Sequence, residues 1–379
     1  MELALYHPDF GYYARSDRRS GRAGDFFTSV DAGPLFGELL ARQLEEMAAL
    51  LIADCGVRIA ECDAESPTAS FRIANSFDLV EAGAADGRLS ADILRAARAD
   101  APAFYRSIRL HLVERSPAAR AAQPATLGDE ADRLIASSPE LPESFEGALI
   151  TNELIDALPV HQVLMAEDGL REVYVAAGPE RLTLVEGPPS TPALAEYLSR
   201  IGVELRRGWR VEINLCACEW VRQAARRLRR GFIILIDYGH EARELYSGSH
   251  SSGTLTTFHR HQSAGPESAA PAWLQLPGEQ DMTAHVDFTS LRAAAEGEGL
   301  QTLGFLDQTY FLLGLLPREF GNQESIPDAQ SIRNAQSAIR NLKTLILPAG
   351  LGSTHKVMIF GKGVGTPRLR GCSYRMRVT

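Results

Sequence analysis

Several features that would restrict the function are missing from this chain of 379 residues. Lysine occurs only at positions 343, 356 and 362, and the net charge is −9, so no overall basic surface favours a nucleic acid or an anionic membrane. No run approaches the ~20 apolar residues of a membrane-spanning helix, and the amino terminus has no signal- or transit-peptide pattern. We therefore expect a cytoplasmic protein that neither binds nucleic acid nor inserts into a membrane.

Cysteine and histidine are also sparse and irregularly spaced. The five cysteines form no C-x-x-C pair, and their odd number fits reduced thiols better than a disulfide framework. The nine histidines include no H-E-x-x-H helix. The sequence therefore predicts no metal site.

The composition, with 45% hydrophobic and 23% charged residues, supports a substantial core in one large domain or two. A glycine- and aromatic-rich segment precedes a predicted helix at Pro34–Ile52, so residues 1–60 are interpreted as a lid with its supporting helix. Residues 61–379 are predicted to form the main domain, with insertions at about 160–205 and 245–350.

Short apolar runs alternate with amphipathic stretches along the main domain. Strands are predicted at Phe77–Glu81, Ile108–Glu114, Gly147–Thr151, Arg210–Leu215 and Phe232–Asp237. Helices are predicted between them at Leu89–Ala99, Ala118–Leu127 and Cys216–Arg229. This alternation indicates an α/β fold with a mostly parallel, Rossmann-like sheet and helices on both of its faces.

The two insertions have different patterns. Residues 161–185 alternate between apolar and polar around Asp168-Gly169, which predicts a β-hairpin. The stretch Gly248–Pro277 is rich in Ser, Gly, Pro and Ala and is predicted to be a long loop. Helices are predicted after it at Asp287–Glu298 and Asp328–Leu347.

The most informative segment, residues 77–94, joins an apolar run to an amphipathic helix through a turn with glycines. The run ends at Glu81, and the turn carries Gly83 and Gly87. Such a corner binds nucleosides or phosphates in Rossmann-like sheets, because glycine lets the backbone approach a ligand. The next strand-like run ends at Glu114. Two acids at adjacent strand ends suit a ribose diol and an amine rather than a pyrophosphate.

A third strand-like run is followed by Asn152, Glu153 and Asp156. If the strand passes into a helix there, Glu153 and Asp156 lie on one face, near the ligand crevice of the sheet. The alternative is a structural role, in which Asn152 caps the helix and the acids favour its positive end. The residues alone leave both roles open.

Two later segments also carry ionisable side chains. A buried strand ends at Asp237 in an Asp-Tyr-Gly string, which is either a functional site or a strand-terminating turn. The predicted loop region contains His261 and His285, and functional residues concentrate in loops. As isolated residues, both histidines would more often be hydrogen-bonded structural histidines.

Together these segments resemble one family, the MidA-like S-adenosylmethionine-dependent methyltransferases, which include the mitochondrial arginine methyltransferase that assists assembly of respiratory complex I. The resemblance runs in order and nearly from end to end. It rests on the Glu81 loop and on the strings Tyr6-His-Pro, Gly11-Tyr-Tyr, Gly24-Asp-Phe-Phe-Thr-Ser, Glu114-Arg-Ser-Pro, Asn152-Glu-Leu-Ile-Asp-Ala-Leu-Pro, Asp237-Tyr-Gly, Gly253-Thr-Leu and Asp281-Met-Thr-Ala-His-Val-Asp-Phe.

The resemblance implies a Rossmann-like class I methyltransferase sheet with an amino-terminal lid segment, an inserted β-hairpin and a carboxyl-terminal helical elaboration. It also implies S-adenosyl-L-methionine as the cofactor. Glu114 is expected to bind the ribose, and Asn152 to lie at the strand end nearest the transferring methyl group. The full set of implied cofactor-binding residues is Gly24, Asp25, Thr28, Glu81, Gly83, Gly87, Glu114 and Asn152.

The resemblance further implies protein arginine methylation that supports complex I assembly, with a complex I subunit as the protein substrate and a homodimer left open. A pair of carboxylates can orient and neutralise a guanidinium through bidentate hydrogen bonds. Glu153 and Asp156 are therefore the candidate acceptor-binding residues. The other candidates for catalysis are Asn152, Asp237, His261 and His285.

Two departures from the family pattern leave other functions open. The family loop usually reads Glu-x-Gly-Pro-Gly-x-Gly, and Ala85 replaces its middle glycine, where a methyl group restricts positive φ and close approach to the cofactor. Many members carry a few dozen residues before the Glu2-Leu-Ala-Leu-Tyr string, so we expect either a missing covering helix or a misassigned start codon. A binding or assembly protein with a weakened cofactor site and a small-molecule methyltransferase remain alternatives. A nicotinamide-dependent oxidoreductase fits less well, because Glu114 falls later than the ~20 residues expected for its ribose acid.

Overall fold

The computed structural model describes residues 1–14, 28–61, 76–179, 181–259, 262–264, 271–316, 340–347, 351–352 and 354–374. The chain forms two compact units, each built from three separate stretches. Unit 1 comprises residues 1–27, 153–224 and 237–298, and unit 2 comprises 28–152, 225–236 and 299–379. The predicted domain division at residue 60 stays a prediction, although unit 2 extends across that position.

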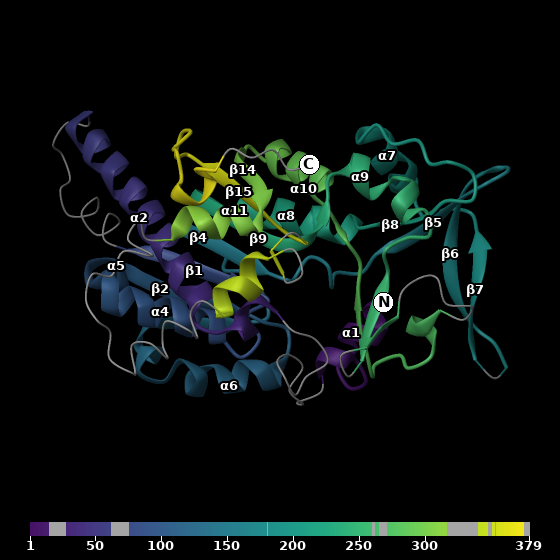
Figure 1. The fold of residues 1–379 in the computed structure, drawn as a ribbon, viewed down its shortest axis with the longest axis horizontal. Coiled ribbons are helices and arrows are strands. Elements are labelled where there is room, and N and C mark those ends of the chain that lie inside the picture. Colours follow the sequence, from purple (N-terminus) through teal and green to yellow (C-terminus); the bar gives the residue numbers. More distant parts are fainter. Residues whose placement is uncertain are drawn as a thin grey trace. The chain divides into compact units, whose positions relative to one another are not determined.

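Unit 2 is built on a mostly parallel sheet, as the alternating strands and helices predict (Figure 1). The strand order is β14-β15-β9-β4-β1-β2-β3. Its strands are β1 (Phe77–Ala82), β2 (Ile108–Val113), β3 (Leu134–Ser138), β4 (Phe145–Asn152), β9 (Leu228–His240, which continues into unit 1), β14 (Gln301–Asp307) and β15 (His355–Lys362). Its longer helices are α2 (Leu35–Glu61), α4 (Arg88–Asp100), α5 (Pro102–Ser107), α6 (Pro117–Leu127) and α11 (Gln308–Leu315). The strand order reverses between β1 and β4, and ligands of such sheets bind outside the carboxyl ends of the strands at this switch point.

One face of this sheet forms the main core of unit 2. Alternate strand residues such as Leu79 and Ile150 lie on this face, because successive side chains of a strand point to opposite faces, and both are fully buried. They belong to one apolar cluster with Leu44 of α2, Leu94 of α4 and Phe311 of α11. The helix predicted at Pro34–Ile52 is confirmed as α2, and α2 extends further, to Glu61.

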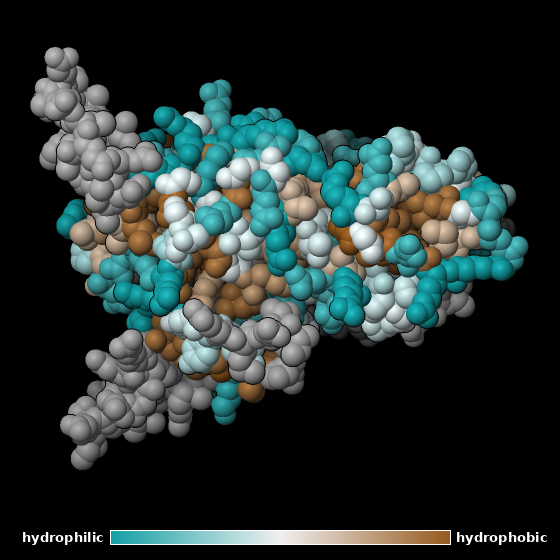
Figure 2. Space-filling model, turned by 90° about the horizontal axis from the view of Figure 1, so that it is seen from above, coloured by the Kyte–Doolittle hydropathy of each residue, from teal (hydrophilic) through white to brown (hydrophobic). Residues whose placement is uncertain are grey.

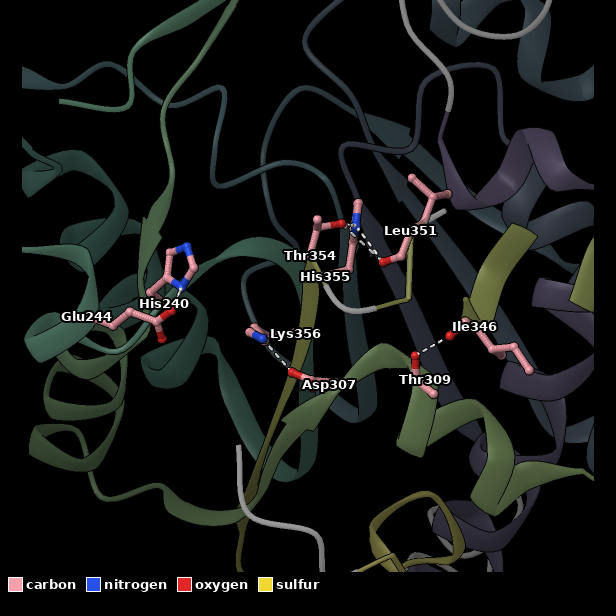
Figure 3. Close-up of polar contacts among 9 residues, drawn as sticks. All are labelled: His240, Glu244, Asp307, Thr309, Ile346, Leu351, Thr354, His355 and Lys356. Atoms are coloured by element: carbon pink, nitrogen blue, oxygen red, sulfur yellow. Dashed lines mark hydrogen bonds and ion pairs between the residues drawn. The ribbon is translucent and has the colours of Figure 1, made fainter. Parts of the chain in front are cut away.

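The carboxyl-terminal region contributes more than the predicted helices. β14 and β15 pair antiparallel at the edge of the sheet, and Lys356 forms an ion pair with Asp307, its partner in the register (Figure 3). Neither strand was predicted from the sequence. β15 is a short apolar run buried on both faces, and this pattern does not distinguish a strand from a helix. The helix predicted at 287–298 is confirmed as α10, Phe288–Gly297, whereas most of the helix predicted at 328–347 lies outside the described residues.

Unit 1 contains two antiparallel sheets. The first has the order β7-β6-β5-β8, formed by β5 (His161–Ala166), β6 (Gly169–Ala177), β7 (Leu182–Gly187) and β8 (Arg210–Ile213). β5 and β6 pair antiparallel, which confirms the predicted hairpin. The prediction that the β8 run joins the parallel sheet is wrong, because β8 pairs antiparallel with β5.

The second sheet of unit 1 has the order β11-β10-β12, formed by β10 (Thr256–His259), β11 (Gln262–Ala264) and β12 (Asp281–Thr283). The prediction of one long loop over 248–277 is therefore wrong where β10 and β11 form. The remaining elements used below are α1 (Glu2–Tyr6), α7 (Ala193–Arg200), α8 (Leu215–Arg227, which ends in unit 2), α9 (Ala242–Leu245) and β13 (Val286–Asp287).

The described helices include none that is long and apolar enough to span a membrane. Hydrophilic residues are spread over the face shown in Figure 2, with smaller hydrophobic areas between them. Exposed apolar side chains such as Val175 and Val185 are of the kind that folded protein surfaces commonly carry.

Candidate functional site

The loop after β1 turns back onto the end of β2. Gly83 and Gly87 have φ angles of +75° and +85°, in the left-handed region that glycine enters without a steric penalty. The N–H groups of Gly83 and Ala84 both donate to the carbonyl oxygen of Val113, at 2.9 and 3.1 Å. A Cβ added at Gly87 would lie 3.2 Å from Cδ1 of Leu112, so close packing also favours glycine there.

Ala85 adopts a left-handed backbone, with φ of +45°, despite its methyl group. For a non-glycine residue this conformation costs about 1–2 kcal/mol. Two hydrogen bonds hold it: its N–H donates to Oε2 of Glu114 at 2.9 Å, and its carbonyl oxygen accepts from Nε2 of Gln123 at 2.8 Å. The loop therefore keeps a glycine-like shape although the middle glycine of the family pattern is absent.

Glu114 lies at the end of β2 and is half-buried. Its Oε1 accepts from the N–H of Ser116 at 2.7 Å, and its Oε2 accepts from Ala85. A carboxylate has about four acceptor positions, so Glu114 keeps the capacity to accept two further hydrogen bonds. This geometry fits the predicted binding of two ribose hydroxyl groups.

Glu81 is engaged inside the protein. It is 6% exposed, and its Oε2 accepts from both the N–H and the hydroxyl of Ser90, in the first turn of α4. Burial raises the pKa of Glu81 to about 8, against the opposing effect of the Ser90 hydrogen bonds. In this structure Glu81 secures the start of α4, and its predicted contact with a cofactor stays a prediction.

The amino-terminal segment of unit 2 is tied to the same loop. Thr28 precedes the short helix η2 (Ser29–Ala32), and its N–H donates to Oδ2 of Asp31 at 2.9 Å. Asp31 forms an ion pair with Arg88, the first residue of α4. Thr28 is therefore held beside the loop that carries Gly87, whereas Gly24 and Asp25 lie outside the described residues.

No helix follows β4, because residues 153–160 form turns and bends. The prediction that Glu153 and Asp156 share a helix face is therefore wrong, and Asn152 is not a helix cap. The carboxylate of Asp237 holds this turn, since it accepts from the N–H groups of Ile155 at 2.8 Å and Asp156 at 3.3 Å. The turn is thereby fixed by a side chain from β9 rather than by helical hydrogen bonds.

The acids of this loop differ in their surroundings. Asp156 is 4% exposed and accepts from the hydroxyl of Tyr238 at 2.5 Å. Asp237 is fully buried, and burial, reinforced by Asp156 and Glu153, raises its pKa well above the ordinary value. Glu153 is half-buried and has φ of +53°, so it is the more accessible carboxylate in a strained backbone position.

The first residues of the chain pack onto this loop within unit 1. The rings of Tyr6 and Tyr13 stack with their centroids 5.4 Å apart. The Tyr6 hydroxyl donates to the carbonyl oxygen of Ala157 at 3.0 Å, and the Tyr13 hydroxyl donates to Oδ1 of Asp281 at 2.9 Å. The strings at the start of the chain and at Asp281 thus support the loop that carries Asp156.

The structure describes only one of the two predicted histidines, His285. His261 lies outside the described residues. His285 lies beside His240 and His250, neither of which was predicted, because no regular spacing marks them in the sequence. Burial and these two neighbouring imidazoles lower the pKa of His285 to about 4.

This chain matches known proteins in sequence. Residues 31–306 match the family described as "Putative S-adenosyl-L-methionine-dependent methyltransferase". The chain belongs to this family. The match covers most of the chain, and it confirms the methyltransferase family suggested by the motifs.

This methyltransferase is similar to a curated group of animal proteins named protein arginine methyltransferase NDUFAF7, mitochondrial. It is 29% identical to the Mus musculus protein over 340 residues, which cover 82% of this chain and 68% of the relative. It is 30% identical to the Danio rerio protein over 339 residues, which cover 82% of this chain and 71% of the relative.

A solved bacterial structure resembles this methyltransferase over nearly its whole length. The protein is a COG1565 superfamily member from Burkholderia thailandensis, crystallised with S-adenosyl-homocysteine. The TM-score is 0.81 at 28% identity, and the alignment covers 98% of this chain and 88% of the bacterial chain. The Rossmann-like class I fold and S-adenosyl-L-methionine as the cofactor are thereby confirmed.

Proposed function

We propose that this methyltransferase modifies arginine residues of a protein. The observation that carries the proposal is Glu153, a half-buried carboxylate held with positive φ directly after β4. Strained backbone of this kind persists where the surroundings enforce it, and it concentrates at functional sites. The names of the NDUFAF7 relatives support the same acceptor.

Residues of unit 2 are proposed to bind the cofactor. Glu114 would accept from the ribose hydroxyl groups, and the loop with Gly83 and Gly87 would allow close backbone approach. Thr28 would help to close the site, and Asn152, the last residue of β4, would lie nearest the methyl group. The donor sets fit a cationic sulfonium with a ribose, because they offer carboxylates and amides.

The acceptor is proposed to bind through Glu153. When bound, the cofactor would supply an electrophilic methyl group on a positively charged sulfur. A guanidinium nitrogen of the acceptor would take this methyl group, the electrons of the carbon–sulfur bond would stay with the sulfur, and the proton lost from the nitrogen would pass to the carboxylate of Glu153. Glu153 would hold the guanidinium through two parallel charge-assisted hydrogen bonds. Positioning and electrostatic stabilisation would supply most of the acceleration.

The other acids are proposed to position the acceptor loop. Asp237 binds two loop amides, and Tyr238 binds Asp156, so neither Asp237 nor Asp156 is as accessible as Glu153. We therefore place Asp237 and Asp156 in support of Glu153. This revises the two-carboxylate clamp expected from the sequence.

The protein substrate is proposed to be a complex I subunit, as the family resemblance implies. The homodimer and the cytoplasmic location stay predictions, and the named animal relatives are mitochondrial.

The acceptor can be tested by incubating the full chain with S-adenosyl-L-methionine labelled in its methyl group and a cell extract. We expect label in the protein fraction, and mass spectrometry of digested proteins should locate it on arginine. Label in small molecules, or on another residue type, would overturn the arginine proposal. Absence of cofactor binding in calorimetry would instead favour an assembly protein with a weakened site.

A further inference from the structure

Three histidines of unit 1 that are separated in sequence gather at one place. His240 ends β9, His250 ends the short helix η4 (Gly248–His250), and His285 precedes β13. One ring nitrogen from each lies within 4.8 Å of the other two. The ring centroids are 4.9, 5.4 and 5.7 Å apart, and the ring planes are tilted rather than stacked.

Backbone pairing brings the three residues together. β13 runs parallel to the end of β9, with Val286 opposite Gly239, so His285 lies beside the end of β9. The N–H of His285 donates to the hydroxyl of Thr254 at 3.1 Å. The N–H of Gly253 donates to the carbonyl oxygen of His250 at 2.9 Å. The Gly253-Thr-Leu string therefore frames the histidine cluster, a role that methyl transfer does not require.

One residue, Glu244, lies against two of the rings. Nδ1 of His240 lies 3.1 Å from Oε1 of Glu244 (Figure 3), and Nδ1 of His250 lies 3.2 Å from the carbonyl oxygen of Glu244. Metal-binding histidines are commonly oriented in this way, by a carboxylate or a carbonyl group on the nitrogen that does not bind the metal. Both contacts are made by Nδ1 and do not use Nε2, the other ring nitrogen that can bind a metal.

The third ring, that of His285, has a buried nitrogen to which no described protein group is bonded. Nδ1 of His285 is buried and has no hydrogen-bond partner among the described residues. An imidazole nitrogen of this kind, buried and beside two further imidazoles, can serve as a metal ligand.

We propose that His240, His250 and His285 bind one divalent transition-metal ion of the zinc class. Imidazole nitrogens suit zinc and its neighbours, whereas calcium and magnesium prefer oxygen ligands. Tetrahedral bonds of ~2.1 Å place ligand nitrogens roughly 3.4 Å apart, so nitrogens that now lie within 4.8 Å of one another would approach by at most about 1.4 Å. Three histidines leave the fourth position open to water or another ligand. This assignment departs from the sequence prediction of no metal site and does not depend on the arginine acceptor.

The test uses the full chain without a polyhistidine tag, after treatment with a chelator. Calorimetry with Zn²⁺ should show one ion per chain, and Co²⁺ should produce the visible absorption of a tetrahedral site. Glu244→Gln should weaken Zn²⁺ binding by about 10–100-fold, and His250→Ala by more than that. The control is His161→Ala, because His161 is also partly exposed and lies 2.7 Å from a carboxylate oxygen, that of Glu172, but is not part of the cluster. It should bind Zn²⁺ like the unaltered protein.

Three results would overturn the proposal: no stoichiometric Zn²⁺ binding by the unaltered chain, unchanged affinity in His250→Ala, or an equal loss in His161→Ala. Circular dichroism and S-adenosyl-homocysteine affinity report whether each variant is folded. If His250→Ala does not fold, the Co²⁺ spectrum of the unaltered chain decides, since a spectrum without tetrahedral absorption contradicts the site.

Discussion

The loops after β1 and β4 share an unusual backbone feature and use it in different ways. Each contains one non-glycine residue with positive φ, Ala85 and Glu153, and the described residues include no others. At Ala85 the main chain makes the contacts, through its N–H to Glu114 and its carbonyl oxygen from Gln123. At Glu153 the side chain is a half-buried carboxylate, which a glycine would remove.

The backbone strain at Ala85 is tolerated by the loop, whereas the backbone strain at Glu153 is proposed to serve the reaction. Both positions carry a conformational cost of about 1–2 kcal/mol that glycine would relieve. If Ala85 contributes only its backbone, glycine should be acceptable there. If Glu153 contributes its carboxylate, glycine should increase stability while it removes activity, as often happens at functional sites.

The largest effect on activity is expected for a substitution in the loop after β4. Glu153→Gln should lower kcat for arginine methylation by roughly 10²–10³-fold, because a neutral amide cannot offset the charge of a guanidinium. The affinity for S-adenosyl-homocysteine should stay unchanged. Single-turnover transfer of labelled methyl groups, with calorimetry in parallel, measures both quantities.

Two matched variants sharpen this result. Asp156→Asn should reduce transfer less, because Asp156 is buried and bonded to Tyr238. Glu153→Gly should lose activity like Glu153→Gln but unfold at higher denaturant concentration, since the relief of about 1–2 kcal/mol of strain exceeds the roughly 0.5–1 kcal/mol of added backbone entropy in the unfolded chain. Near-normal transfer by Glu153→Gln would return this residue to a structural role.

Glu114, which holds the loop after β1, provides the next test. Glu114→Ala should weaken binding of S-adenosyl-L-methionine by roughly tenfold or more, since each charge-assisted hydrogen bond contributes ~1.5–3 kcal/mol. Calorimetry on the folded variant measures the loss. Glu140→Ala is a suitable control, because Glu140 also follows a strand of the same sheet but is exposed. Equal affinities for both variants would remove Glu114 from the cofactor site.

Glu81 provides a pH-dependent test of the same loop. Its folded-state pKa of about 8 lies above the ordinary value of 4.5, so the folded chain keeps a proton that the unfolded chain releases between these values. The free energy of unfolding should therefore fall as pH rises through this range, by at most ~1.4 kcal/mol per pH unit from this group. Urea unfolding at several pH values should show a smaller decrease for Glu81→Gln. Identical slopes would mean that Glu81 is already ionised in the folded chain.

The smallest effect is expected for Ala85→Gly. Relief of about 1–2 kcal/mol of strain is opposed by roughly 0.5–1 kcal/mol of added backbone entropy in the unfolded chain, so stability should change by about 1 kcal/mol or less. Binding of S-adenosyl-L-methionine should tighten if the methyl group crowds the cofactor. Calorimetry checks this, and an unchanged affinity would show that the loop accommodates alanine fully.

The amino-acid sequence by itself predicted the elements around the cofactor corner. β1, β2, β4, α4 and α6 appear at their predicted positions, because apolar periodicity and turn glycines act over a few residues. The acid at the end of β2 and the positive-φ glycines after β1 follow from the same local patterns. The motif strings were also sufficient to identify the family and its cofactor.

Only the tertiary structure decided which distant residues meet. The sequence suggested a helix after Asn152, but the chain turns there, and Asp237, far along the chain, binds the backbone of the turn. The apolar pattern of β8 is compatible with a strand in either sheet. Its pairing with β5 places it in the antiparallel sheet of unit 1. His240, His250 and His285 have no common spacing; pairing of β13 with β9 brings His285 beside His240, and the helix η4 adds His250. Local preferences determine elements, whereas strand partners and side-chain clusters depend on contacts between residues far apart in sequence, which no local pattern records.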